Sequence, residues 1–160
     1  MVYHRKIRQD VERFGGRVEK LMGDGVFAVF GAPVTHEDDP ERAVRSALRM
    51  QRSVDDLNAA DPELSLSVRI AVTTGEAIVQ ISGEDRDREG IIGDVVNTAS
   101  RLEAVAPPGG VVVDERTYLL TRGVVIYADL DPVAVKGKVE PLPIWQPLEA
   151  RSRFGVDVDR

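Results

Sequence analysis

The sequence predicts an α/β domain of the α+β kind, with helices packed over one face of a largely antiparallel sheet in a ferredoxin-like βαββαβ order. Short strand-like segments occur in pairs, and long amphipathic helices separate the pairs, as this class requires. The length of 160 residues fits one domain, and a hydrophobic content of 42% is sufficient for a packed core.

The composition excludes several classes of protein. Cysteine is absent, which removes disulfides and thiol chemistry. Acidic residues number 27 and basic residues 21, and the resulting net charge of −6 argues against a nucleic-acid partner. The first residues are charged, unlike a signal peptide, and no apolar run approaches the roughly 20 residues of a membrane helix. We therefore expect a cytoplasmic domain with no membrane insertion.

The N-terminal part predicts a helix followed by a strand pair. His4–Phe14 has apolar residues at helical spacing and is stopped by Gly15 and Gly16. Arg17–Met22 and Val26–Phe30 are strand-like and are joined by a Gly-Asp-Gly turn. The second strand is apolar on both faces, which is typical of a strand covered on two sides.

The longest predicted helix runs from about Pro40 to Asn58, after a loop over Pro33–Asp39. Asp39 suits the N-cap position, and Pro40 suits the first turn. Apolar residues recur on one face of this helix at the helical period: Ala43, Ala47, Met50, Val54 and Leu57.

The middle of the chain predicts a strand pair and a second helix. Apolar and polar residues alternate over Leu64–Thr73, and Gly75 turns the chain into a partner strand, Ala77–Ile81. A charged loop, Ser82–Gly90, leads to the helix Gly93–Val105. Three residues are expected on the buried face of that helix: Val95, Ala99 and Leu102.

The C-terminal part predicts a strand over Val111–Val113, a helix over Glu115–Thr121 and two terminal strands, around Val124–Tyr127 and Ile144–Leu148. The chain after Glu149 is expected to lack fixed structure. The predicted organisation is therefore one domain over residues 1–149 and a flexible tail over residues 150–160.

Lys20 and Asp24 are the first residues that suggest chemistry. On the predicted strand, Lys20 shares a face with Val18 and Met22, an unusual place for a charge without a partner. Asp24 lies in the Gly-Asp-Gly turn, where its carboxylate suits a hard divalent cation such as Mg²⁺. A surface lysine and an ordinary turn aspartate also explain the two residues.

A second group lies on the helix Gly93–Val105, where Asn97 and Arg101 are four residues apart and share the polar face. Such a pair suits a ribose and a phosphate, since a guanidinium matches phosphate oxygens with two hydrogen bonds. Solvated surface positions explain these residues too. Ligand binding and ordinary surface exposure are also the two explanations for three further basic residues: Arg69, on the polar face of its strand, and Lys136 and Lys138, on either side of Gly137.

Four segments in a fixed order favour the functional interpretation: VEKLMGDGVFAVFGAP, VRIAVTTGE, GDVVNTASRLE and VKGK. Together they resemble the catalytic domain of the class III nucleotidyl cyclases, the adenylate and guanylate cyclase family, in its bacterial form. The resemblance runs from about His4 to Leu148. It implies an adenylate cyclase, an enzyme that converts ATP into cyclic AMP and pyrophosphate, with Mg²⁺ or Mn²⁺ as cofactor.

The resemblance implies roles for the residues that bind substrate and metal. Lys20 matches the lysine at the adenine edge, and Asp24 matches the second of two aspartates on the metal pair. Arg69 matches an arginine that reaches the polyphosphate. Lys136 matches the lysine at the terminal phosphates, with Lys138 as a near alternative.

The resemblance also implies two catalytic residues and a shared site. Asn97 matches the asparagine that orients the ribose, and Arg101 matches the arginine that stabilises the transition state. In the family, the Asp24-type and Arg69-type residues come from one subunit, whereas the Lys20-, Asn97- and Arg101-type residues come from the other. A head-to-tail homodimer is therefore part of the hypothesis.

The sequence departs from the family pattern at two places. The family's opening strand carries a Phe-x-Asp motif with the first metal aspartate, which is missing before Asp24; Asp10, in a predicted helix, does not replace it. The chain is therefore expected to begin after that strand and to have impaired activity. The second departure is Gly90, at the purine-selecting position where the family usually has aspartate or threonine, so adenine selection rests on Lys20.

Two functions follow from these observations. The first is an adenylate cyclase domain, favoured by Lys20, Asn97 and Arg101. The second is a catalytically silent cyclase homologue that acts as a nucleotide-binding or partner-binding regulatory module, favoured by the missing aspartate. An unrelated ferredoxin-like binding domain would need four coincident motifs. The acidic loop Gly83–Glu89 is interpreted as solvated, with regulation as the alternative.

Overall fold

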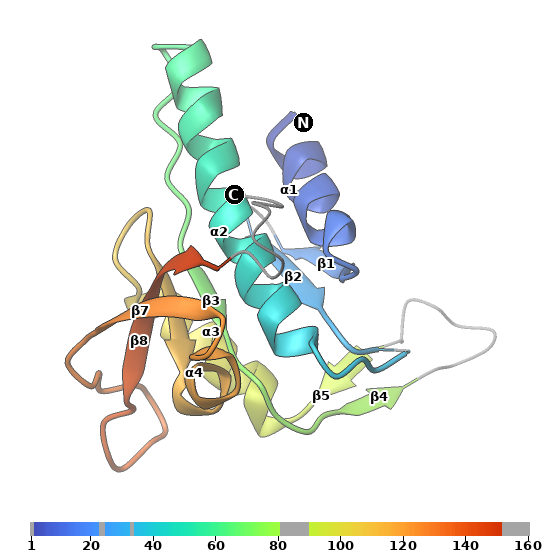
Figure 1. Ribbon diagram of the computed structural model, residues 1–160, viewed down its shortest axis with the longest axis vertical. Coiled ribbons are helices and arrows are strands. Elements are labelled where there is room, and N and C mark those ends of the chain that lie inside the picture. Colours follow the sequence, from blue (N-terminus) through green and yellow to red (C-terminus); the bar gives the residue numbers. More distant parts are fainter. Residues whose placement is uncertain (1, 23–24, 33, 81–89, 152–160) are drawn as a thin grey trace.

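The computed structural model describes residues 2–22, 25–32, 34–80 and 90–151 (Figure 1). The helices are α1 (Val2–Arg13), α2 (Asp39–Ala60), α3 (Asp94–Val105) and α4 (Glu115–Thr121). The strands are β1 (Arg17–Met22), β2 (Gly25–Val29), β3 (Ile70–Val72), β4 (Ile78–Gln80), β5 (Gly90–Ile92), β6 (Val111–Asp114), β7 (Val125–Asp129) and β8 (Ile144–Ala150). The predicted α+β class is confirmed. No helix in the described ranges is long and apolar enough to cross a membrane.

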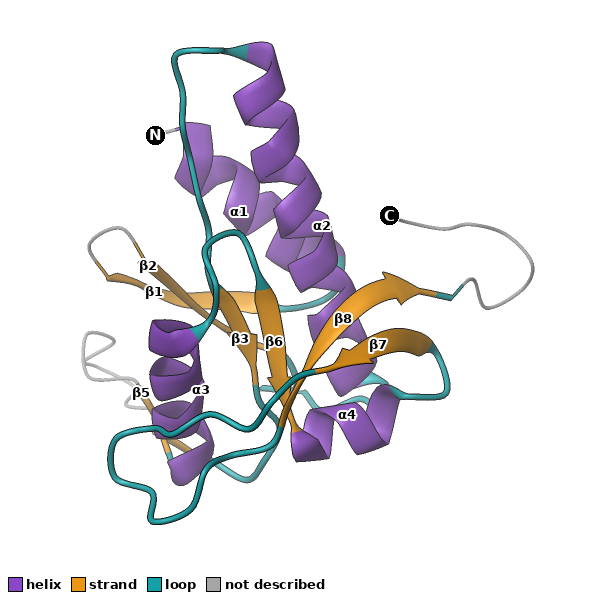
Figure 2. Ribbon diagram, turned by 90° about the vertical axis from the view of Figure 1, so that its left-hand side faces the viewer, coloured by secondary structure: helices purple, strands orange, loops and turns teal. Residues whose placement is uncertain are grey.

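Four strands form the central sheet in the order β3-β6-β8-β7 (Figure 2). β3 and β6 are parallel, whereas β6 with β8 and β7 with β8 are antiparallel, so the sheet is largely antiparallel, as predicted. The other described sheets are the pairs β1-β2 and β4-β5. β8 includes Ala150, which the sequence analysis assigned to the tail, and residues 152–160 of that tail lie outside the described ranges.

Helices cover both faces of the central sheet, not one face as predicted. Val112 and Ile144 pack in a core cluster with Leu102 of α3. Val113, the next residue of β6, packs in a second cluster with Val44 of α2. Because consecutive strand residues point to opposite faces, α3 lies on one face and α2 on the other. β6 is therefore a strand buried on both sides.

The predicted strand over Leu64–Thr73 is much shorter in the structure, where β3 contains only its last part. The Leu66 amide donates to Asn58 Oδ1, and Asn58 Nδ2 donates to the Leu66 carbonyl, both at 2.9 Å. These bonds attach the segment to the end of α2 instead of a sheet. The predicted pairing with Ala77–Ile81 is also wrong, because β4 pairs with β5, which begins at a residue predicted in a loop, Gly90.

α2 divides its buried surface between the central sheet and α1, which lies alongside it (Figure 1). Ser46 Oγ donates to the Asp10 carbonyl, and Ser53 Oγ donates to the Asp10 carboxylate at 2.6 Å. Asp10 is only 2% exposed, so this carboxylate links two helices. The divided surface explains why the predicted apolar face is partly wrong. The helix buries Ala47 and Val54 as predicted, half-buries Ala43, Met50 and Leu57, and also buries Val44.

Candidate active site

The candidate site is built on α3, which stands beside the central sheet (Figure 2). Of the residues predicted on its buried face, Leu102 is fully buried, whereas Val95 and Ala99 are half-buried. On the polar side, Asn97 is exposed and Arg101 is half-buried. Leu102 thus attaches the helix to the core while its polar residues face outward.

A tight turn over Val135–Lys138 lies alongside α3. The Lys138 amide donates to the Val135 carbonyl at 3.3 Å, and Gly137 has a φ of +87°, a conformation that favours glycine. Val135 packs in the core cluster that contains Leu102. Lys138 Nζ lies 3.1 and 2.9 Å from the two carboxylate oxygens of Asp94, the first residue of α3. The turn is therefore attached to α3 at both of its ends.

The guanidinium of Arg101 lies against the tip of this turn. A Cβ atom added to Gly137 would be 3.1 to 3.2 Å from Nη1, Cζ and Nη2 of Arg101. Asp94, Asn97 and Arg101 share one face of α3, because they follow one another at helical spacing. Within the described ranges, no residue makes a hydrogen bond or ion pair with the Arg101 guanidinium, whose N–H groups can therefore bind an anion.

The structure distinguishes the two candidate lysines of the turn. Lys138 makes the ion pair with Asp94, and its side chain is 27% exposed. Lys136 is exposed at the tip of the turn, next to the glycine that contacts Arg101. Lys136 is thus placed for a ligand near Arg101, whereas Lys138 is occupied in attaching the turn.

Arg69 is exposed and lies at the other end of α3. The next amide along the chain, that of Ile70, donates to the carbonyl of Gly110, which follows α3. At the opposite end of β3, Thr73 Oγ1 donates to the carbonyl of Val95 in the first turn of α3. A helix of 12 residues is about 18 Å long. Arg69 therefore lies toward the C-terminal end of α3, whereas the Val135–Lys138 turn reaches from Leu102 and Arg101 to Asp94 at its start.

The remaining predicted site residues lie on the two hairpins or outside the described residues. Lys20 is in β1, opposite Phe27 of β2, so the predicted hairpin is present. β2 is half-buried along its length, not covered on both faces as predicted. Asp24 lies outside the described residues, as does the acidic loop Gly83–Glu89. Gly90, the position expected from the resemblance to select the purine, opens β5.

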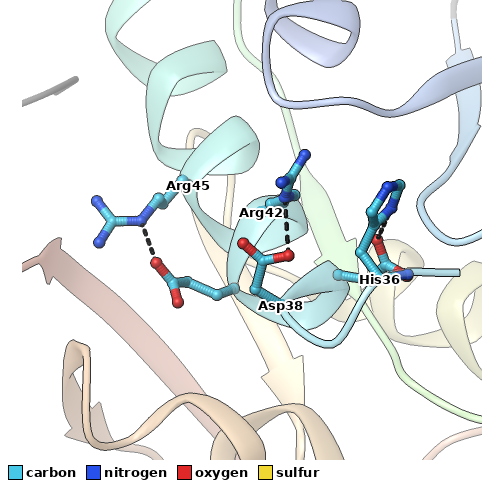
Figure 3. A network of polar contacts seen from close by, with 6 residues as sticks. His36, Asp38, Arg42 and Arg45 are labelled. Atoms are coloured by element: carbon cyan, nitrogen blue, oxygen red, sulfur yellow. Dashed lines mark hydrogen bonds and ion pairs between the residues drawn. The ribbon is translucent and has the colours of Figure 1, made fainter. Parts of the chain in front are cut away.

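Polar contacts fix the loop between β2 and α2 (Figure 3). The buried carboxylate of Asp39 accepts a hydrogen bond from the His36 amide at 2.7 Å, and its other oxygen is 3.5 Å from His36 Nδ1. Asp39 is therefore the first residue of α2, and Asp38 takes the N-cap position predicted for Asp39. Asp38 accepts from Arg42 Nε at 2.9 Å. This network holds the chain that follows β2.

Asp114 is a described carboxylate whose pKa is shifted from its ordinary value. Burial raises the pKa of Asp114 above its ordinary value, while hydrogen bonds from the amide and hydroxyl of Thr117 act in the opposite direction. These bonds make Asp114 the N-cap of α4. Its role is therefore structural and separate from the polar face of α3.

Asp94 and Gly137 were not among the candidate site residues expected from the sequence. Asp94 lies three residues before Asn97, and this helical spacing was a signal that places both on one face. The contact of Gly137 with Arg101 joins residues far apart in sequence, and no local pattern indicates it.

Comparison with known proteins identifies a family whose profile matches most of this sequence. The profile of the family described as "Adenylate and Guanylate cyclase catalytic domain" matches residues 3–146. Adenylate cyclase 1 of Rhizobium meliloti (strain 1021) is 30% identical over 143 residues, which are 82% of this chain and 21% of that protein. The chain thus spans about a fifth of the length of this relative.

Two solved structures are similar over nearly the whole chain. The adenylyl cyclase CyaB from P. aeruginosa has a TM-score of 0.85 and 30% identity, and the match covers 96% of this chain and 82% of that chain. The guanylyl cyclase Cya2 has a TM-score of 0.84 and 28% identity, with 97% and 81% covered. The first structure is named as an adenylyl cyclase and the second as a guanylyl cyclase, so structural similarity alone does not choose between ATP and GTP.

Proposed function

Because the chain belongs to the adenylate and guanylate cyclase catalytic domain family, we propose that it is an adenylate cyclase domain. The proposed reaction is in-line attack of the 3′-hydroxyl of ATP on its α-phosphate, which forms cyclic AMP and releases pyrophosphate. The observation that supports it most is the polar face of α3, where the Arg101 guanidinium lies beside the turn that carries Lys136. A guanidinium and an ammonium in one place suit a polyphosphate.

Each residue of this face has a role in the proposal. Asn97 orients the ribose through its amide. Arg101 donates hydrogen bonds to the phosphate oxygens, where negative charge develops in the transition state, and so lowers the barrier. Lys136 contacts the terminal phosphates. Lys138 has no direct role in this scheme, since its ammonium is paired with Asp94.

The proposed cofactor is Mg²⁺ or Mn²⁺, with Asp24 as its ligand. A metal pair supplies activation of the attacking oxygen and charge neutralisation. The described part of the chain contains no group of three or more side chains that could hold a metal, and Asp24 lies outside it. The described residues therefore do not fit a metal pair by themselves, and no step is derived through the metal. With one metal carboxylate identified in the sequence, we expect slow turnover.

The proposal includes a head-to-tail homodimer with composite sites. In the family the Arg69-type residue and the Arg101-type residue come from different subunits, so a complete site would need two chains. Ile78 and Ile92 lie directly opposite each other on β4 and β5 and are 69% and 55% exposed. An exposed apolar pair of this kind supports contact with a second subunit.

Base preference provides the experiment that tests the proposal. The Lys20 ammonium can donate to N1 of adenine, whereas N1 of guanine carries a hydrogen. We expect the unmutated chain to bind ATP more tightly than GTP and to form cyclic AMP, and Lys20→Glu to lose the ATP preference. Lys6→Glu, the same charge change in α1, is the control.

Binding and cyclic nucleotide formation are measured separately, by calorimetry and by chromatography of the products. Equal affinity for ATP and GTP in the unmutated chain would contradict adenine selection by Lys20. ATP binding without any cyclic AMP, with Mg²⁺ and with Mn²⁺, would instead support the silent regulatory module.

A further inference from the structure

We propose that Gly137 and the Asp94–Lys138 ion pair together position the Arg101 guanidinium for catalysis. Arg101 is the catalytic residue in this inference. Gly137, Asp94 and Lys138 are positioning residues that do not touch the nucleotide. The inference rests on the proposed cyclase function and assigns residues of that same site which the sequence analysis left without this role.

The turn is fixed at two points that lie on either side of its tip. On one side, Val135 is 8% exposed and packs with Leu102 in the core. On the other side, both carboxylate oxygens of Asp94 bind Lys138 Nζ. Val135 in the core and the ion pair on the surface thus hold the tip at Gly137 beside α3.

Gly137 provides the surface on which the guanidinium of Arg101 rests. Three guanidinium atoms are nearly equidistant from the Cβ position of Gly137, at 3.1 to 3.2 Å, so the flat group faces the glycine. A planar group held by its face keeps the N–H groups at its edge free for phosphate oxygens. A methyl group at this position would be closer than an ordinary contact, so the guanidinium would have to shift by a few tenths of an ångström.

Positioning of this kind acts on turnover more than on affinity. A reactive group displaced by about 1 Å can cost roughly a hundredfold in rate. The ground-state contact of the nucleotide with Lys20 does not depend on where the Arg101 guanidinium lies. Because Lys136 lies in the same turn, we expect damage to the turn to lower kcat by a larger factor than it raises KM.

The first test compares two glycines with the same backbone conformation. Gly137 has a φ of +87° and contacts Arg101, whereas Gly109 has a φ of +77° and no atom within 4 Å of its Cβ position. Gly137→Ala and Gly109→Ala should therefore cause similar backbone strain and a similar fall in Tm. We expect kcat to fall at least about tenfold in Gly137→Ala only. Equal kcat values in the two variants would overturn the inference.

The second test exchanges the ion pair. Asp94→Asn and Lys138→Gln should each lower kcat, and the double variant Asp94→Lys/Lys138→Asp should recover most of the loss. If Lys138 contacts the polyphosphate directly, the exchange places a carboxylate there, KM rises, and no recovery follows. That outcome would overturn the positioning role.

A third readout separates this inference from the proposed function. The Nε–Hε NMR signal of Arg101, assigned by its loss in Arg101→Lys, reports the environment of the guanidinium without turnover. We expect it to shift or broaden in Gly137→Ala and in Asp94→Asn but not in Gly109→Ala. An unmutated chain that forms no cyclic nucleotide contradicts the proposed function, whereas an Arg101 signal that is the same in all variants contradicts the positioning.

Discussion

Leu102→Ala is the substitution for which the structure gives the clearest magnitude. Leu102 is fully buried between α3 and the central sheet, in a cluster with Ala106, Val112, Val135 and Ile144. Removing a buried leucine side chain leaves a cavity and lowers the free energy of unfolding by about 2–5 kcal/mol. At about 2–4 °C per kcal/mol for a chain of this length, we expect Tm to fall by roughly 5–15 °C.

The assay is thermal unfolding followed by circular dichroism, together with urea unfolding at one temperature. Leu119→Ala in α4 is the matched control, because Leu119 is 50% exposed and should change the free energy of unfolding by less than about 1 kcal/mol. A Leu102→Ala variant as stable as Leu119→Ala would refute the assignment of this residue to the core. It would also remove the argument that α3 is fixed firmly enough to present Arg101.

Two further predictions concern the shared site and the pH dependence of stability. Mixing Arg69→Ala and Asn97→Ala chains should restore about a quarter of the unmutated rate, because half of the dimers are mixed and each mixed dimer has one intact site out of two. Dimers that form without recovering activity would contradict shared sites. Asp114, whose pKa is raised by burial, should stabilise the fold fully below about pH 4 and lose this contribution as the pH rises through its folded-state value. The free energy of unfolding of the unmutated chain, minus that of Asp114→Asn, should therefore decline from about pH 4 to pH 7. The same substitution at exposed Asp131 is the control. A difference that grows over this range would contradict the predicted direction of the pH dependence.

Local patterns predicted the elements whose pairing is local. The hairpin β1-β2 has a Gly-Asp-Gly turn between two strand-like runs, and α4 matches its predicted bounds, Glu115–Thr121. The sheet order required contacts that no local pattern contains. β3 pairs in parallel with β6, some forty residues later, and Asn58 holds the backbone of Leu66 away from any sheet. The alternation over Leu64–Thr73 therefore overestimated the strand.

In the candidate site too, the sequence predicted the residue types and their helical faces but not the contacts between distant residues. Residue types and helical spacing were sufficient to place Asn97 and Arg101 on one face of α3. They were not sufficient to choose between Lys136 and Lys138, which flank the same glycine. That choice depends on the ion pair between Lys138 and Asp94, which joins residues 44 apart in sequence.

The two sides of α3 link stability to the proposed catalysis. Leu102 and Arg101 are consecutive residues, so one side chain enters the core while its neighbour faces the turn. The same core cluster contains Val135, the first residue of that turn. A cavity at Leu102 would therefore loosen both the helix that carries Arg101 and the glycine on which Arg101 rests. Leu102→Ala should consequently lower kcat even at temperatures where the chain is fully folded, whereas Leu119→Ala should lower neither stability nor kcat appreciably.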